Sequence, residues 1–147
     1  MTKTYYRLVD VQKNIYPSSV SRTVSSKQKV ILDANALLMP FQFGVNLDLE
    51  LERLVGECDV LVPSSVLGEL RKLVGTDKHA KAALDLAQKY EVREVEDSGD
   101  ASILSLAGKE AGIVVTNDRE LIQKLRESGI PVISLRSRTH LVIEGHI

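Results

Sequence analysis

A short apolar stretch that ends on an acid, residues 30–35 (Val-Ile-Leu-Asp-Ala-Asn), constrains this chain more than any other feature. Its first three residues, two of them β-branched, are typical of a short strand that is buried on both faces. Ligands bind at the carboxyl ends of the strands in an open α/β sheet, so Asp33 is expected to face a crevice. Taken alone, an acid at this position is more often a turn residue or a helix cap.

The rest of the chain alternates between further apolar runs and segments with helical periodicity. Predicted strands cover residues 59–63, 113–116 and 131–135, and predicted helices include residues 47–57 and 64–75. Strands that alternate with helices form a parallel sheet with helices on both faces. We therefore predict an α/β fold in which residues 131–135 are the last strand and residues 136–147 form a tail with some β character.

Local signals refine three of these elements. Asn46 is placed to cap the helix over residues 47–57, and Ser64 is placed to cap the helix that follows the second strand. The apolar stripe of this later helix is expected to extend to Val74. Residues 91–95 alternate between polar and apolar side chains, which is typical of an edge strand.

Length and composition limit the class of protein. A chain of 147 residues suffices for one domain with a real core. The single cysteine, Cys58, excludes an intrachain disulfide framework and a CxxC zinc site, and its apolar neighbours predict a buried, inert thiol. No apolar run approaches the ~20 residues of a membrane span, and the N-terminus lacks the apolar region of a signal peptide. We therefore expect a cytoplasmic protein without a membrane partner.

The charge is distributed unevenly, although the net charge is only −1. Residues 1–29 hold six basic residues and one acid, which leaves the remainder of the chain acidic. The same segment contains Tyr5, Tyr6 and Tyr16, and basic residues between aromatics suit a single-stranded nucleic acid. The alternative is a partly ordered arm, an edge strand or a dimer contact. We divide the chain into a basic N-terminal extension, residues 1–27, and a domain, residues 28–147.

Four acids stand out by their positions relative to the predicted elements: Asp33, Glu69, Asp100 and Asp118. In a doubly wound sheet, the strand ends and the first turns of the helices that leave them converge at one rim. Each acid has an ordinary explanation when taken singly, because Asp100 and Asp118 could be helix caps and Glu69 a solvated helix residue. These ordinary explanations are less convincing for four acids at one rim, which together indicate a functional site.

Electrostatics shows what such a group of acids would require. Two carboxylates ~4 Å apart repel each other by about 4 kcal/mol at an effective dielectric constant near 20. Four of them together would cost more than a domain can spare from its ~5–15 kcal/mol of stability. The group must therefore take up protons, bind cations or recruit basic side chains. A site of oxygen ligands alone suits the hard divalent cations Mg²⁺ and Mn²⁺.

Motifs for several other chemistries do not occur in the sequence. It contains no GxxxxGK[ST] phosphate loop, no GxGxxG and no HExxH. A phosphatase of the haloacid dehalogenase type would need a second Asp two residues after Asp33, where Asn35 stands. The three histidines show no metal-ligand spacing.

Four pieces of the sequence, taken together, resemble the PIN domain family, which has a metal-dependent nuclease fold. The pieces are residues 30–35 (VILDAN), 66–70 (VLGEL), 99–103 (GDASI) and 114–121 (VVTNDREL). The resemblance covers about residues 28–136. Residues 33–44 (DANALLMPFQFG), together with the later TNDREL, are most similar to the PIN proteins of ribosomal RNA processing and their archaeal relatives. The VapC-type toxins form the neighbouring branch and share the acids.

The resemblance implies a three-layer α/β/α sandwich whose central parallel sheet has the strand order 3-2-1-4-5. It also implies an acidic pocket whose members act as catalytic residues and as ligands of one or two Mg²⁺ or Mn²⁺ ions: Asp33, Glu69, Asp100 and Asp118. Asn35 and Thr116 resemble the polar residues that support these carboxylates.

The function implied by the resemblance is that of a metal-dependent endoribonuclease acting on a ribosomal RNA precursor. Water activated by the metal would hydrolyse the phosphodiester and leave a 5′-phosphate and a 3′-hydroxyl. Seven basic residues could hold the flanking phosphates, or they are ordinary surface charges: Arg71, Lys72, Lys78, Lys81, Arg119, Arg136 and Arg138. The alternatives are a VapC-like toxin blocked by a protein partner and an RNA-binding module without turnover. Dimers are common in the family, so the resemblance is also compatible with a homodimer.

Overall fold

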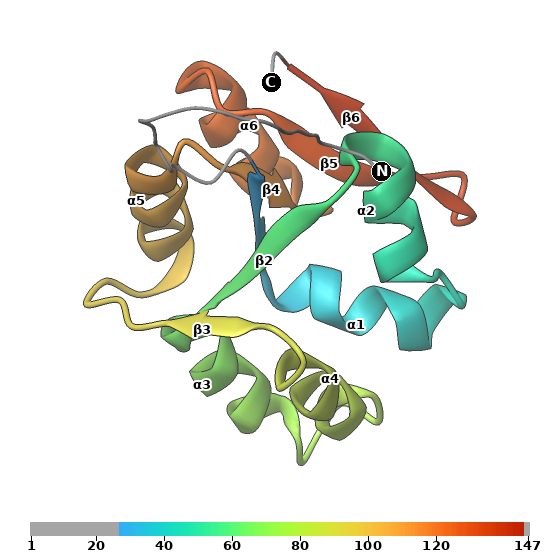
Figure 1. Ribbon diagram of the computed structural model, residues 1–147. Coiled ribbons are helices and arrows are strands. Elements are labelled where there is room, and N and C mark those ends of the chain that lie inside the picture. Colours follow the sequence, from blue (N-terminus) through green and yellow to red (C-terminus); the bar gives the residue numbers. More distant parts are fainter. Residues whose placement is uncertain (1–26, 146–147) are drawn as a thin grey trace, which may run out of the picture.

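The computed structural model describes residues 27–145, in which six strands form one sheet in the order β3-β2-β1-β4-β5-β6 (Figure 1). The strands are β1 (Gln28–Leu32), β2 (Cys58–Pro63), β3 (Glu91–Arg93), β4 (Ile113–Val115), β5 (Val132–Arg136) and β6 (His140–Glu144). β1 to β5 are parallel, so the predicted α/β fold and the order 3-2-1-4-5 are confirmed. The basic residues and tyrosines of residues 1–26 lie outside the described residues.

The sixth strand corrects the prediction that residues 131–135 end the sheet. β6 pairs antiparallel with β5, and Arg136 lies opposite His140 at the turn. Ser137 and Arg138 in this turn have φ angles of 56° and 60°, the left-handed region that tight hairpins use. Glycine, asparagine and aspartate usually mark such positions, and their absence here hides the hairpin from sequence reasoning.

Six helices flank the sheet in the three-layer arrangement that was predicted (Figure 1). The helices are α1 (Ala34–Phe43), α2 (Leu47–Val55), α3 (Ser64–Leu73), α4 (Ala80–Ala87), α5 (Gly99–Glu110) and α6 (Arg119–Glu127). α5 and α6 lie on one side of the sheet and α1 and α2 on the other, while α4 packs on both α1 and α3. No helix within residues 27–145 is both long and apolar enough to cross a membrane.

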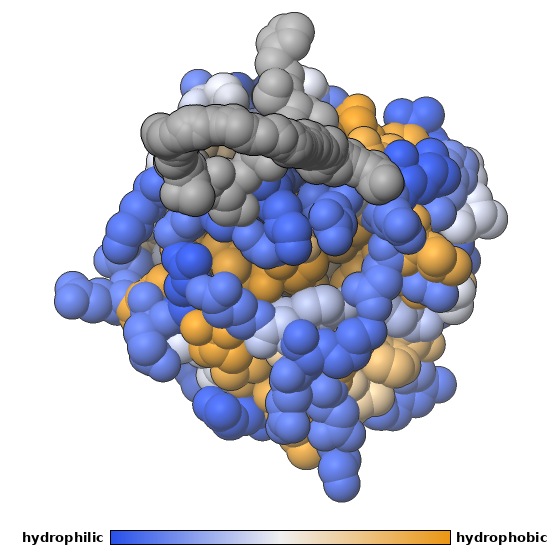
Figure 2. All heavy atoms as spheres, in the orientation of Figure 1, coloured by the Kyte–Doolittle hydropathy of each residue, from blue (hydrophilic) through white to orange (hydrophobic). Residues whose placement is uncertain are grey.

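Buried apolar side chains of the central strands form the core. Val30, Ile31 and Leu32 of β1 are fully buried, as the opening stretch of the sequence predicts. Val114 and Val115 of the neighbouring β4 are equally buried. Polar and charged residues cover most of the face seen in Figure 2, with apolar residues visible between them. A rigid core below the strand ends therefore supports whatever side chains follow those strands.

The helix ends agree only in part with the sequence prediction. Asn46 caps α2, because its side chain accepts a hydrogen bond from the Leu49 N–H at 3.1 Å, as predicted. The prediction for Ser64 is wrong, since Pro63 is the N-cap of α3 and the Ser64 hydroxyl instead accepts the Val95 N–H at 3.0 Å. Val74 lies beyond the end of α3 and is 45% exposed, so it does not belong to the apolar stripe.

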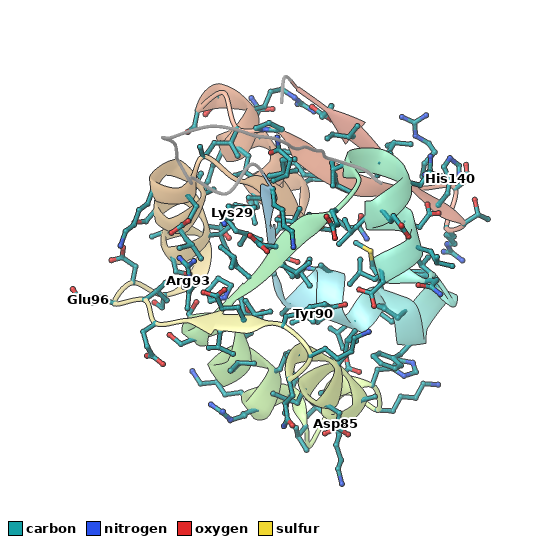
Figure 3. All side chains as sticks on the ribbon, viewed as in Figure 1. Lys29, Asp85, Tyr90, Arg93, Glu96 and His140 are labelled. Atoms are coloured by element: carbon teal, nitrogen blue, oxygen red, sulfur yellow. The ribbon has the colours of Figure 1, made fainter. Side chains whose placement is uncertain are left out.

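Arg93, at the end of the edge strand β3, connects this strand to α5 (Figure 3). Its guanidinium forms ion pairs with Glu91 of the same strand and with Glu110 of α5. Residues 91–95 were predicted as an edge strand, and β3 lies at one edge of the sheet with only β2 beside it. The ion pair with Glu110 therefore links the end of β3 to the C-terminal end of α5.

Candidate active site

Asp33 follows β1 directly and serves as the N-cap of α1. The side chain is only 7% exposed. Its Oδ1 accepts a hydrogen bond from the Ala36 N–H at 2.8 Å, and its Oδ2 accepts one from the Thr116 hydroxyl. Both roles that the sequence suggested for Asp33 are therefore present, because this residue caps a helix and also faces the crevice at the carboxyl end of a strand.

Thr116 follows β4 and connects two of the acids. Its fully buried hydroxyl donates to Asp33 and accepts the backbone N–H of Asp118 at 3.1 Å. The two residues meet because β1 and β4 are neighbours in register, with Leu32 opposite Val115. Thr116 therefore fixes both the Asp33 carboxylate and the backbone that precedes α6.

Asp118 lies at the start of α6 and is its N-cap. Its Oδ1 accepts hydrogen bonds from the backbone N–H groups of Glu120 at 2.9 Å and Leu121 at 3.3 Å. An N-cap carboxylate stabilises the helix end by satisfying backbone donors that have no partner within the helix. The side chain is thus held in place at the rim where β4 ends.

The four acids that the sequence singled out surround one small cavity of about 60 Å³. Asp33 comes from the end of β1, Glu69 from α3, Asp100 from the first turn of α5 and Asp118 from the start of α6. The other lining residues are Ala34, Asn35, Ser65, Val66, Gly99, Ile103 and Leu121. Folding thus brings together carboxylates that are far apart along the chain.

Burial and negative charge both act on Asp33. Burial is the main factor that raises the pKa of this carboxyl, and the charges of Glu69 and Asp118 raise it further. The hydrogen bonds from Thr116 and Ala36 lower the pKa, but the resulting value is still about 7. Without a bound cation, the cavity therefore takes up a proton at Asp33 near neutral pH, as a cluster of carboxylates must.

Asp100 and Glu69 are less buried than Asp33. Asp100 is not the helix cap that its position in the sequence suggested, because Ser98 occupies the N-cap of α5. The Asp100 Oδ2 instead accepts a hydrogen bond from the ammonium of Lys124 on α6 at 3.1 Å. Glu69 is exposed on α3 and lines the cavity.

Known proteins resemble this chain in sequence. A family model described as "PIN like domain" matches residues 30–138. The chain belongs to the PIN-like domain family. It is 34% identical to "Ribonuclease VapC9" of Archaeoglobus fulgidus over 119 residues, which cover 78% of this chain and 87% of that protein. It is 30% identical to "Ribonuclease VapC4" of Methanocaldococcus jannaschii over 129 residues, which cover 81% of this chain and 98% of that protein.

Solved structures show the same PIN fold. The PIN domain endonuclease Utp24 has a TM-score of 0.68 at 23% identity, and the match covers 81% of this chain and 92% of that chain. The complex VapBC2 of Rickettsia felis, bound to a DNA fragment from its promoter, contains a chain with a TM-score of 0.57 at 16% identity. That match covers 74% of this chain and all of the other chain. At these identities the likeness establishes the fold.

The remaining predicted residues of this PIN-like domain are placed as follows. Thr116 supports Asp33 and the backbone of Asp118, whereas Asn35 is an exposed residue in the lining of the cavity. The seven basic candidates are all exposed, and none of them lines the cavity within the described residues. The guanidinium of Arg138 lies 6.0 Å from the ring centre of Phe43, a cation–π contact at the end of α1.

Sequence reasoning missed two residues at this site. Lys124 pairs with Asp100, and Ser65 lines the cavity while its hydroxyl shares a 2.8 Å hydrogen bond with that of Ser102. Helical spacing could have identified Ser65, because it lies four residues before Glu69 and so shares a helix face with it. No local signal marks Lys124, since its partner Asp100 lies on another helix.

The donor atoms of this PIN cavity fit a hard divalent cation, because the charged groups that line it are all carboxylates. Within the described part of the chain, no three carboxylate, imidazole or thiolate groups lie as close together as the ligands of one ion do, so a single ion held by three of these acids would require their side chains to turn inward. Mg²⁺ usually needs only one or two protein carboxylates and keeps several waters.

A larger groove of about 460 Å³ lies elsewhere in the domain, among residues of α2, β2 and β3. Cys58 lines it, and burial raises the pKa of this half-buried thiol to about 11. The thiol is therefore protonated and unreactive at neutral pH, although it is less buried than the sequence predicts. The chemistry of this domain is better supported at the smaller, acidic cavity.

Proposed function

We propose that this protein is a metal-dependent endoribonuclease whose active site is the acidic cavity. The carrying observation is that Asp33, Glu69, Asp100 and Asp118 line one cavity in which the pKa of Asp33 is about 7. Two relatives at 34% and 30% identity bear the name ribonuclease, which supports RNA as the substrate.

In this proposal, Asp33, Asp100 and Asp118 hold one or two Mg²⁺ or Mn²⁺ ions, and Glu69 is a ligand or orients a bound water. The bound cation would supply an acidified water and charge neutralisation at the scissile phosphate. Asp33 is suited to its role because the Ala36 N–H and the Thr116 hydroxyl hold its two oxygens in fixed directions. Thr116 acts as a positioning residue, and Asn35 is proposed to support the carboxylates from the cavity wall.

Exposed basic residues of the domain are proposed to hold the phosphates that flank the cleaved bond. Lys72 lies one helical turn beyond Glu69, and Arg119 follows Asp118 directly. Arg71 lies on the same helix as Lys72, while Arg136 and Arg138 lie at the turn between β5 and β6. Contacts of exposed Arg and Lys with phosphates fix the register of a nucleic acid without reading its sequence.

The biological substrate has two candidates. A role in ribosomal RNA processing is supported by the similarity of residues 33–44 to the PIN proteins of that pathway. A toxin that a protein partner blocks is supported by the names of the VapC relatives. Expression of the full chain separates the two, because a toxin arrests growth and a processing enzyme does not.

The proposal is tested by incubating the purified full chain with labelled RNA and millimolar Mn²⁺. Cleavage is expected in Mn²⁺ and should disappear in EDTA, and Asp33→Asn should abolish it without unfolding the protein. Asp85→Asn is the matched control, because Asp85 is an exposed acid of α4 that lies outside the cavity (Figure 3). RNA binding without cleavage under these conditions would favour the non-catalytic RNA-binding module, and undiminished cleavage in EDTA would refute the metal-dependent mechanism.

A further inference from the structure

Lys124 forms an ion pair with one of the acids that line the cavity, because its ammonium lies 3.1 Å from the Asp100 Oδ2. It lies on α6, three residues beyond the cavity residue Leu121, and reaches across to the first turn of α5. A lysine ammonium is positively charged at neutral pH, so Lys124 brings one positive charge to Asp100.

The Lys124 ammonium lies where the acidic cavity requires positive charge. Four carboxylates around about 60 Å³ require a counter-charge, and Lys124 provides one unit of it at Asp100. A divalent cation that uses Asp100 must approach the same carboxylate. The lysine and the cation therefore compete, since the Asp100 Oδ2 already accepts a hydrogen bond from the ammonium.

We propose that Lys124 is a positioning residue whose ammonium pairs with the Asp100 carboxylate in the metal-free protein. A divalent cation displaces this ammonium from Asp100 when it binds. This inference rests on the proposed function, because it takes the acidic cavity to be the metal site. Displacement needs little rearrangement, since the Lys124 side chain is 51% exposed and can turn toward solvent.

The size of the effect follows from the exposure of the pair. Exposed ion pairs contribute little to stability, so removing the lysine should change the metal affinity by roughly two- to fivefold rather than by orders of magnitude. The direction of the change in metal affinity is therefore more informative than its size. A merely structural lysine would weaken metal binding when it is removed, whereas a competing lysine strengthens it.

The test is isothermal titration calorimetry of Mn²⁺ into the metal-free full chain, which reads binding without any cleavage. Lys124→Gln should bind Mn²⁺ about two- to fivefold more tightly than the wild type, and the gain should shrink at high salt because screening weakens an exposed pair. Lys124→Arg keeps the charge and should restore the wild-type Kd. Lys89→Gln is the matched control, because Lys89 forms a similarly exposed pair with Asp48 outside the cavity and should leave the Kd unchanged.

The outcomes separate this inference from the proposed function. Equal or weaker Mn²⁺ binding by Lys124→Gln overturns the inference alone, while Mn²⁺-dependent cleavage by the wild type still upholds the nuclease. Failure of both the wild type and Lys124→Gln to bind Mn²⁺ overturns the inference together with the metal-dependent mechanism. Tighter binding by the Gln variant, with the Arg variant unchanged, supports the inference even if no RNA is cleaved.

Discussion

At the scale of single residues, the site depends on one carboxylate that is held in an unfavourable environment. Asp33 is buried beside other acids, which raises its pKa, and two hydrogen bonds offset part of that cost. Burying a charge is tolerated only when hydrogen bonds or a counter-charge compensate. Asp33 therefore links the stability of the protein to pH.

The pH dependence of stability should report this carboxyl. The pKa of Asp33 rises from an ordinary 3.8 to about 7 on folding, so its protonated form stabilises the fold below about pH 4. That contribution is lost as the pH rises through 7, by up to about 4 kcal/mol at 1.36 kcal/mol per pKa unit. Urea unfolding in EDTA should show Asp33→Asn gaining stability relative to the wild type between pH 4 and pH 8. A stability difference that does not vary with pH would contradict the buried, protonated acid.

Thr116→Val should show what the hydroxyl contributes. The substitution preserves shape but removes the donor to Asp33 and the acceptor for the Asp118 N–H. We expect a loss of about 1–3 kcal/mol in the free energy of unfolding, because buried polar groups lose their partners. Thr139→Val is the control, since Thr139 is exposed in the β5–β6 turn and should change stability by less than about 0.5 kcal/mol. Equal effects at the two sites would argue against a positioning role for Thr116.

At the scale of elements, the start of α6 has a structural role and, in our proposal, a chemical one. Asp118 caps the helix through Oδ1 and also lines the cavity. Two substitutions can separate these roles, because Asn caps a helix about as well as Asp whereas Ala does not. The negative charge is lost in both variants.

Asp118→Asn and Asp118→Ala should therefore differ in stability but not in activity. We expect the Ala variant to be less stable than the Asn variant by about 1 kcal/mol in urea unfolding, the usual value of an N-cap. Neither variant should cleave RNA in Mn²⁺, since both lack the carboxylate. Cleavage by Asp118→Asn at the wild-type rate would show that the cap is the whole role of this residue.

Sequence reasoning predicted the elements whose signals are local and missed those that depend on tertiary contacts. The buried strand at residues 30–32 and the Asn46 cap follow from apolar runs and capping chemistry. The Ser64 prediction is wrong because the hydroxyl finds a partner, Val95, that only the folded chain brings near. Lys124 was not predicted because a lysine on an amphipathic helix has no distinguishing signal in the sequence. Only the folded chain shows that α5 places Asp100 beside it.

At the scale of the whole molecule, the sheet order creates the site. The parallel arrangement of β3, β2, β1 and β4 brings the segments that follow these strands to one rim, where α1, α3, α5 and α6 begin. The family resemblance supplied the strand order, and the positions of the acids then predicted their convergence. What the sequence could not supply is the degree of burial, which makes Asp33 differ from the more exposed Glu69.

Cation binding should stabilise the whole domain. A ligand that binds only the folded state at 100 times its Kd adds about 2.7 kcal/mol to the free energy of unfolding. We expect Mn²⁺ to raise the Tm of the wild type in a concentration-dependent manner and EDTA to reverse the rise. The Asp33→Asn/Asp118→Asn double variant should show a much smaller rise than the Asp85→Asn control. Equal rises in both would place the bound Mn²⁺ elsewhere on the protein.

The most direct measurement of the central claim is anomalous diffraction from crystals of the full chain soaked in Mn²⁺. The account predicts an anomalous peak in the cavity, within ligand distance of Asp33 and of at least one of Asp100 and Asp118. At Mn²⁺ concentrations that saturate cleavage, a cavity without such a peak would contradict the account, as would a Mn²⁺ ion held only by acids elsewhere on the surface.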